Sequence, residues 1–150
     1  MLNERHDDGF LLTDDPERLD HELVHRWISD TYWGGGRTLD AMRRAIAGSE
    51  SVGVYREADG QQVAFARVVT DGAVFAYLCD VFVDPACRGR GLGRWIVGRL
   101  RDDLIARGLK RFLLSTRTAQ GVYAPLGFTP VDETRWMECD LRATAGRLAS

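Results

Sequence analysis

Hydrophobic positions change their period along the chain, and these changes divide it into candidate helices and strands. Hydrophobic side chains recur every three or four residues from Leu19 to Trp27, which predicts an amphipathic helix. Asp14–Pro16 supplies the cap and the proline typical of a helix start. Thr38 has the side chain of a helix cap and predicts a second helix beyond it. Residues 31–37, with three consecutive glycines, form the expected loop between the two helices.

The middle of the chain changes to the alternating and continuous hydrophobic runs of strands. We expect strands at Val52–Arg56, Gln62–Thr70 and Ala73–Val83, because turn-forming Asp-Gly pairs separate them. Leu92–Leu104 returns to helical spacing, and Gly108 is expected to end this helix. The remaining expected elements are strands at Gly9–Thr13, Arg111–Thr116, Phe128–Val131 and Arg135–Leu141 and a short helix at Ala119–Leu126.

The resulting element order is βααβββαβαββ, in which the central helix connects two neighbouring strands that should be parallel. This order predicts an α/β (α+β) sandwich with a mixed central sheet of about seven strands and helices on both faces. The sequence contains no internal repeat, low-complexity tract or linker. We therefore expect residues 1–150 to form a single domain.

Composition and charge narrow the classes of function. The 150 residues, with a hydrophobic share of 45%, suffice for one hydrophobic core. No window is long and apolar enough for a membrane span, and the polar N-terminus does not resemble a signal peptide. The formal net charge of −2 argues against general nucleic-acid binding. Cys79, Cys87 and Cys139 lack metal-type spacing, which fits reduced thiols in a cytoplasmic protein.

The glycine-rich turn Asp84–Arg94 is the most informative segment. Alternate glycines allow unusual dihedrals, and the first turn of a helix offers unpaired N–H groups at a positive dipole end. Together these features favour binding of a phosphate or pyrophosphate. The P-loop sequence Gly-Lys-Ser/Thr is absent, and the dinucleotide fingerprint fails because Arg94 stands at its third glycine. The pattern that fits is Arg-x-x-Gly-x-Gly, at Arg88, Gly91 and Gly93.

This pattern resembles the coenzyme A pyrophosphate motif of the GNAT superfamily of N-acetyltransferases. The resemblance extends upstream to the strand Tyr77–Val83, which is similar to the polyamine acetyltransferase branch. It extends downstream to Tyr123–Phe128, which resembles the family's Tyr-x-x-x-Gly-Phe segment. The resemblance implies the GNAT fold, acetyl-CoA as co-substrate, an amine acceptor and no metal. The acceptor stays open among a polyamine, an amino-acid derivative, an antibiotic and a protein amine, as does the use of other acyl groups.

The resemblance also implies which residues bind the co-substrate. The backbone at the end of the expected strand should pair with the pantetheine arm like an added strand, and the N–H groups of the glycine-rich turn should cradle the pyrophosphate. An N–H near Phe82 should polarise the thioester carbonyl, as an oxyanion hole does. The implied residues are Val81, Phe82, Val83, Arg88, Gly89, Arg90, Gly91, Leu92, Gly93 and Arg94.

Two residues are candidates for acid–base catalysis. Tyr123 matches the family position of the acid that protonates the departing thiolate, and a phenol is protonated at neutral pH. Asp80 is the candidate for the base or for substrate binding. Simple alternation places Asp80 on one strand face with Leu78 and Phe82, unless a bulge interrupts the strand. Cys79 stands where the polyamine branch has a second acid, which leaves the identity of the base open.

The loop between the first two helices is expected to line the acceptor site, because it walls that site in the resembled family. Tyr32 and Trp33 offer an apolar or cation-binding surface beside the three glycines. Arg37 is a candidate for binding a substrate carboxylate. Members of the resembled family often form dimers, so a homodimer is left open.

Two alternative functions stay open beside the acetyltransferase. One is a coenzyme-A-binding sensor without turnover. The other is a zinc peptidase, since His21–His25 fits the pattern His-Glu-x-x-His on an expected helix. A zinc site of that kind needs a third protein ligand. Both histidines also lie off the apolar helix face that contains Leu19, Leu23 and Trp27, so we interpret them as part of a solvated face.

Overall fold

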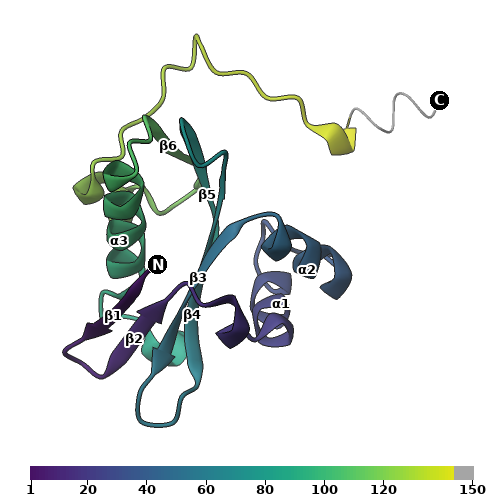
Figure 1. Ribbon diagram of the computed structural model, residues 1–150. Coiled ribbons are helices and arrows are strands. Elements are labelled where there is room, and N and C mark those ends of the chain that lie inside the picture. The colour runs from purple at the N-terminus through teal and green to yellow at the C-terminus, as the bar shows by residue number, and fades with distance from the viewer. Residues whose placement is uncertain (144–150) are drawn as a thin grey trace.

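A six-stranded mixed sheet forms the centre of the protein in a computed structural model that describes residues 1–143 (Figure 1). Neighbouring strands from β1 to β5 pair antiparallel, whereas β5 and β6 pair parallel. The strands lie side by side in their order along the chain: β1 (Asn3–His6), β2 (Phe10–Thr13), β3 (Glu50–Arg56), β4 (Gln62–Thr70), β5 (Phe75–Val83) and β6 (Arg111–Leu114).

Helices cover both faces of this sheet, with α1 and α2 on one face and α3 and α4 on the other (Figure 1). The α-helices are α1 (His21–Ser29), α2 (Leu39–Ala47), α3 (Leu92–Ala106) and α4 (Gln120–Tyr123). Three single turns of 3₁₀ helix are η1 (Pro16–Arg18), η2 (Pro85–Cys87) and η3 (Ala124–Leu126). Among residues 1–143, no helix is both long enough and apolar enough to cross a membrane.

Each face of the sheet carries its own hydrophobic core, as expected for a sandwich. The larger core lies under α3 and includes Leu12, Val54, Leu78, Ile96 and Leu100. The smaller core lies under α1 and α2 and consists of Val24, Ile28, Met42, Ile46 and Phe65. The sheet is therefore buried on both faces, and its exposed edges and strand ends are left to form sites.

The predicted fold class is confirmed, and several boundaries differ for local reasons. The first helix begins at His21 and not near Pro16. Asp15 caps only the turn η1, because its carboxylate accepts from the Glu17 N–H. Asp20 caps α1 itself by accepting from the Leu23 N–H at 2.9 Å.

The two strands expected at Phe128–Val131 and Arg135–Leu141 are absent, which is the main correction to the predicted order. Pro130 has no N–H to donate to a ladder. The Asp132 carboxylate then accepts from the Thr134 N–H at 3.0 Å, which bends the chain into a turn. The sequence analysis also missed β1, whose residues are all polar, as is common in an edge strand.

Candidate active site

The parallel pair β5–β6 covers only the first half of β5. Its register runs from Phe75 opposite Arg111 to Leu78 opposite Leu114, where β6 ends. Residues 79–83 therefore have no strand beside them on the β6 side within the described part of the chain. Because an unpaired strand edge presents free N–H and C=O groups, this half of β5 offers a place for an extended ligand.

A β-bulge at the same point turns the end of β5. Between the pairs Phe65–Phe82 and Arg67–Cys79, β5 contains one residue more than β4. Asp80 lies in the bulge with a φ of 54°, the left-handed region that non-glycine residues rarely adopt.

The bulge corrects the expected alternation along this strand. Leu78 belongs to the core under α3, whereas Phe82 belongs to the core under α1 and α2. The Asp80 side chain points to the α1–α2 side, where it contacts Arg37. Asp80 therefore shares a face with Phe82, as expected, but not with Leu78.

The glycine-rich turn leads from the end of β5 into α3 with its backbone uncovered. Gly89 and Gly91 have φ angles of 81° and 75°, which L-residues with a side chain adopt only at a cost. Gly91 caps α3, and no side chain accepts a hydrogen bond from the first N–H groups of the helix. A Cβ built on Gly93 would approach only Val83 Cγ2, at 4.0 Å. The turn thus keeps bare amides beside the free half of β5, which fits a pyrophosphate.

The arginines of the turn lie at its rim. Arg88 donates from Nε to the Val83 carbonyl oxygen at 3.0 Å, and its guanidinium lies 5.2 Å from the centre of the Phe82 ring. The Arg90 guanidinium lies 5.8 Å from the centre of the Phe10 ring. Arg94 is exposed on the first turn of α3. These cations supply positive charge around the bare amides.

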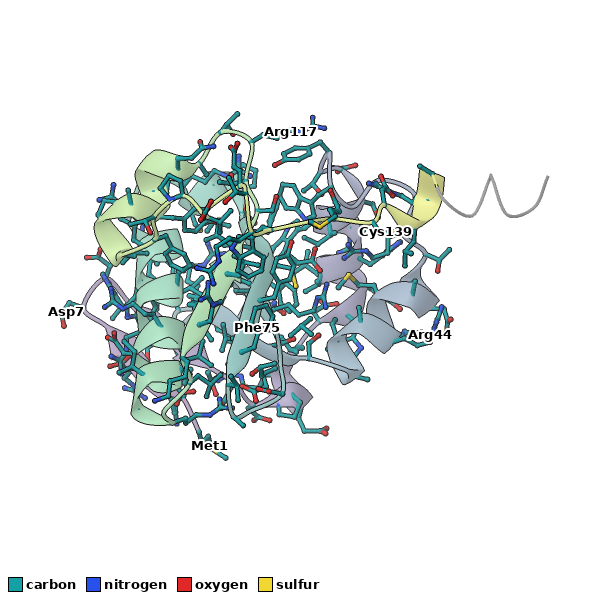
Figure 2. The ribbon with its side chains drawn as sticks, turned by 90° about the horizontal axis from the view of Figure 1, so that it is seen from above. Met1, Asp7, Arg44, Phe75, Arg117 and Cys139 are labelled. Atoms are coloured by element: carbon teal, nitrogen blue, oxygen red, sulfur yellow. The ribbon has the colours of Figure 1, made fainter. Side chains whose placement is uncertain are left out.

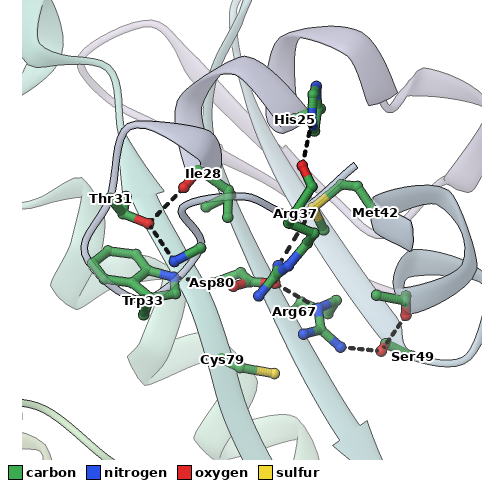
Figure 3. Close-up of polar contacts among 12 residues, drawn as sticks. His25, Ile28, Thr31, Trp33, Arg37, Met42, Ser49, Arg67, Cys79 and Asp80 are labelled. Carbon is green, nitrogen blue, oxygen red and sulfur yellow. Dashed lines mark hydrogen bonds and ion pairs between the residues drawn. The ribbon is translucent and has the colours of Figure 1, made fainter. Parts of the chain in front are cut away.

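On the α1–α2 side, Asp80 is the centre of a buried ion-pair network (Figure 3). Its side chain is only 1% exposed, and its Oδ2 accepts from Arg37 Nη1 at 2.7 Å and from Arg67 Nε at 2.8 Å. Its Oδ1 accepts from the indole Nε1 of Trp33 at 3.0 Å. Arg67 also donates to Ser49 Oγ at 2.9 Å.

This network fixes the loop between α1 and α2 onto the sheet. Trp33 and Arg37 belong to the loop, whereas Asp80 and Arg67 belong to β5 and β4. The Arg37 carbonyl oxygen lies 2.7 Å from His25 Nε2, which ties the end of the loop to α1 as well (Figure 3). The structure thus brings together three predicted site residues, Trp33, Arg37 and Asp80.

Sequence analysis missed Arg67, the fourth member of this network. It is the one charged residue within β4, a strand that is otherwise buried over most of its length. A lone cation in a buried strand needs a partner, so the pattern itself carried a signal for a buried acid opposite it.

Aromatic side chains line the same loop. Tyr32 and Trp33 meet edge to face with ring centres 5.1 Å apart, and Trp27 stacks on Phe82 at 5.2 Å. Tyr32 also reaches the segment that follows β6, since the guanidinium of Arg117 lies 4.5 Å from its ring centre. These rings form an aromatic wall beside the Asp80 carboxylate, which is paired with two arginines.

Tyr123 lies at the end of α4, half-buried against Phe128 at a ring distance of 5.8 Å. Burial raises the pKa of Tyr123, and the nearby Tyr32 raises this pKa further. The phenol is therefore protonated at physiological pH, as an acid must be before it donates.

Cys79 and His25, which the sequence analysis also considered, each have a defined local environment. Burial raises the pKa of Cys79, which keeps it a thiol rather than a nucleophilic thiolate. His25 is bonded to a carbonyl, and residues 1–143 hold no group of three His, Cys, Asp or Glu side chains placed to bind a metal ion.

A bare helix start beside a half-free strand gives this α+β protein a place that suits a pyrophosphate-bearing, extended ligand. Residues 14–128 match the model of the acetyltransferase (GNAT) family, and the chain belongs to this family. This family is one of acetyltransferases.

Individual relatives agree with this placement. Serotonin N-acetyltransferase 2 of rice, a chloroplast protein, is 40% identical over 96 residues, which are 61% of this chain and 48% of that protein. The chain therefore spans about half the length of this relative. A crystal structure of a protein assigned to the GNAT family from Xanthomonas campestris is 42% identical with a TM-score of 0.82, and covers 87% of this chain and 92% of that one.

A more distant structure was solved with acetyl-CoA. A Clostridium acetobutylicum protein solved with acetyl-CoA has a TM-score of 0.65 at 18% identity, over 89% of this chain and 96% of that one. At this identity the likeness shows the fold alone.

Proposed function

We propose that this chain transfers the acetyl group of acetyl-CoA to a primary amine of a small molecule, by direct attack within a ternary complex. The observation that carries the proposal is the junction of the unpaired half of β5 with the uncapped start of α3. One element suits an extended amide-containing arm, and the other suits the diphosphate at its far end.

In this proposal the backbone of Val81, Phe82 and Val83 pairs with the pantetheine arm, and the amides of residues 88–94 bind the pyrophosphate. An N–H near Phe82 polarises the thioester carbonyl. When bound, acetyl-CoA supplies the acetyl group and the sulfur leaving group. The amine nitrogen forms a bond to the acetyl carbon as the carbon–sulfur bond breaks, so the products are the amide and free coenzyme A.

Two protons must move in this reaction. Tyr123 gives its hydroxyl proton to the departing thiolate and regains one from solvent. The attacking nitrogen loses its proton to water, because Asp80, the candidate base, already accepts from three donors. We assign Asp80 to positioning instead: it holds Trp33 and Arg37 where the acceptor binds.

The aromatic wall supports an acceptor with an aromatic or apolar group beside its amine. Tyr32 and Trp33 present ring surface, and Trp33 is 42% exposed. A polyamine needs free carboxylates for its several cations, whereas Asp80 is neutralised by two arginines. The rice relative is named for acetylating serotonin, an aromatic amine.

A panel of amines with acetyl-CoA, followed by thiol release, tests this proposal. We expect kcat/KM for 2-phenylethylamine and serotonin to exceed that for spermidine by at least about 10-fold, since apolar contacts discriminate to about this extent. Spermidine turnover that equals or exceeds the aromatic amines would overturn the acceptor class. Acetyl-CoA binding without thiol release from any amine would favour the non-catalytic sensor.

The variant Tyr123→Phe separates acid catalysis from binding. It should lower kcat by about 100-fold or more, because a positioned acid contributes about that much. The dissociation constant of acetyl-CoA, measured by calorimetry, should stay unchanged. An unchanged kcat would remove Tyr123 from the mechanism.

A further inference from the structure

The buried network around Asp80 holds more positive charge than negative charge. Arg37 and Arg67 both donate to the same oxygen, Oδ2 of Asp80, at 2.7 and 2.8 Å. Within residues 1–143, no other carboxylate forms an ion pair with either guanidinium. Two cations therefore share one acid, and one positive charge has no counter-charge beside the aromatic wall.

The spare N–H groups of these two arginines remain open to a ligand. Arg37 donates only from Nη1, so its Nε and Nη2 have no partner in the described part of the chain. Arg67 donates from Nε and from Nη1, which leaves its Nη2. None of these three nitrogens is a buried polar atom without a partner. Each of them is therefore in contact with solvent, and a ligand can reach it.

The two guanidinium groups form a polar surface over the Asp80 carboxylate. The Asp80 side chain is 1% exposed, whereas the side chains of Arg37 and Arg67 are 23% and 11% exposed. Figure 3 shows both guanidinium groups close to Asp80, with Trp33 and Cys79 beside them. An anion that approaches from solvent therefore meets the arginines before the acid.

A carboxylate fits this surface better than a phosphate does. Arginine N–H groups bind both kinds of anion through charge-assisted hydrogen bonds. A carboxylate brings a single negative charge, which equals the uncompensated charge of the network. A phosphate group brings about 1.5 to 2 negative charges, which exceeds it. The charge balance therefore favours a carboxylate.

The place of this surface also limits the distance between the carboxylate and the amine of an acceptor. Asp80 precedes Phe82 by two residues, about 7 Å along a strand. Both side chains lie on the same face of the sheet. In the proposed function the thioester lies near the Phe82 N–H, so the attacking amine lies there too. A short acceptor, with its amine and carboxylate on one carbon atom, can therefore reach both positions.

We propose that Arg37 and Arg67 bind the carboxylate of the acceptor, and that this acceptor is an α-amino acid with an aromatic side chain. The aromatic group lies against Tyr32 and Trp33, which present ring surface beside the network. The inference rests on the proposed function for the place of the amine. It adds a carboxylate to the acceptor class and adds Arg67 to the acceptor site.

The first test compares phenylalanine with phenylalaninamide, which has the same ring but a neutral amide in place of the carboxylate. We expect kcat/KM for phenylalanine, measured by thiol release from acetyl-CoA, to be higher by at least about 10-fold, as for hydrogen bonds to a charged group. The amide has the less basic amine, like a chain α-amino group, so its larger share of free base works against this result. Equal use of both compounds, or better use of the phosphonate analogue of phenylalanine, would overturn the proposal.

The second test asks whether the two arginines cause this preference. Arg67→Met leaves Asp80 paired with Arg37 alone, which balances the charges, and Arg37→Gln is a second variant in case the first does not fold. Either variant should lose the preference for phenylalanine over its amide. Arg44→Gln is the matched control and should keep it, because Arg44 projects outward from α2 and pairs with the exposed Asp40 (Figure 2). A preference that survives in both arginine variants would contradict the proposal.

Equilibrium binding separates a failure of this inference from a failure of the proposed function. With coenzyme A present, calorimetry should find that N-acetylphenylalanine binds at least about 10-fold more tightly than its amide. This preference without turnover of any amine would support the carboxylate site and overturn only the acetyl transfer. Turnover of 2-phenylethylamine, with equal affinity for the two products or binding of neither, would support the transfer and overturn the carboxylate site.

Discussion

The co-substrate side of the site is made mainly of backbone, whereas the acceptor side is made of side chains. On the first side, the free half of β5 and the amides before α3 offer the polar groups for the proposed binding, and glycines keep them uncovered. On the second side, Asp80 gathers Trp33 and Arg37 from the α1–α2 loop and Arg67 from β4. In the proposed function, backbone geometry would therefore recognise acetyl-CoA, and side chains held by a buried set of charges would recognise the acceptor.

This difference teaches where each half is vulnerable. A backbone site survives most side-chain changes but fails when a side chain fills it. A buried charge network fails when any one member is removed, because the others are left without compensation. A small substitution in the backbone half should therefore weaken ligand binding and leave stability intact, whereas one in the charge network should lower stability.

The largest effect is expected from Asp80→Ala, which leaves Arg37 and Arg67 without their shared acidic partner. Loss of one partner from a buried ion pair costs about 3–5 kcal/mol, so the free energy of unfolding should fall by that amount. Urea denaturation measures it. Asp40→Ala is the matched control, because Asp40 pairs with Arg44 on an exposed helix surface and should cost less than about 1 kcal/mol. A loss of equal size in both variants would show that the network does not stabilise the fold.

The second effect concerns Gly93→Ala, which tests the backbone half. Gly93 has no positive φ, and its added Cβ would meet Val83 Cγ2 only at 4.0 Å, so the fold has room for it. Stability should stay the same or rise by up to about 1 kcal/mol, as for glycine to alanine in a helix. If the pyrophosphate lies against the amides of residues 88–94 as proposed, the added methyl group would crowd it, and the acetyl-CoA dissociation constant should rise about 10-fold to 100-fold, the loss expected for hydrogen bonds to a charged group.

Gly98→Ala in the same helix is its control. A Cβ there would lie 3.7 Å from Leu126 Cδ2, an ordinary contact away from the glycine-rich turn. Calorimetry with acetyl-CoA should find binding unchanged for this variant. If both variants bind equally well, the bare amides are not the pyrophosphate site.

A smaller effect is expected from Trp33→Phe, which removes one donor from Asp80 but keeps an aromatic ring. Both arginines remain bonded to the carboxylate, so the free energy of unfolding should fall by only about 0.5–1.5 kcal/mol. Steady-state kinetics should show a KM for the acceptor raised about 2-fold to 10-fold, with the KM for acetyl-CoA unchanged. The control is Trp95→Phe on α3, the opposite face of the sheet. A change in the KM for acetyl-CoA would show that the two halves of the site are not independent.

The same contrast explains what the sequence could reveal. The glycine-rich turn and the helix after it were predictable, because Gly89, Gly91 and Gly93 form a spaced pattern. The positive φ angles of Gly89 and Gly91 are conformations that glycine adopts readily. The acceptor half depends on Asp80 meeting residues 43 and 47 positions away in the chain, at Arg37 and Trp33. No local pattern encodes such a meeting.

The fold shows the same limit. Local periodicity predicted β4 and α3 well, since each buries a regular hydrophobic face. The bulge at Asp80 placed Asp80 and Phe82 on the face opposite Leu78, because one extra residue in β5 shifts the alternation. The strand pattern of residues 137–141 found no ladder within the described chain, since pairing requires an edge as well as a pattern.

The smallest effect comes from Asp71, which offers an internal model of the backbone half. Its Oδ1 accepts from the N–H groups of Ala73, Val74 and Phe75 at 2.9, 2.8 and 3.1 Å, so bare amides bind an anion here as well. These bonds lower the pKa of Asp71 from 3.8 to about 2. Because the folded pKa lies below the unfolded one, the stabilisation is complete above about pH 4 and is lost as pH falls toward 2.

Asp71→Asn keeps an acceptor oxygen but removes the charge. The melting temperature at pH 7 should be slightly lower than that of the unchanged chain, and the difference should shrink between pH 4 and pH 2, measured by calorimetric scans at both ends. Asp7→Asn, at an exposed hairpin position, should show no such convergence. A difference for Asp71→Asn that persists at pH 2 would mean that its amides respond to the shape of the acceptor and not to its charge. The same amide chemistry before α3 would then need the rim arginines to hold a pyrophosphate, which would make the two halves of the site more alike than their geometry indicates.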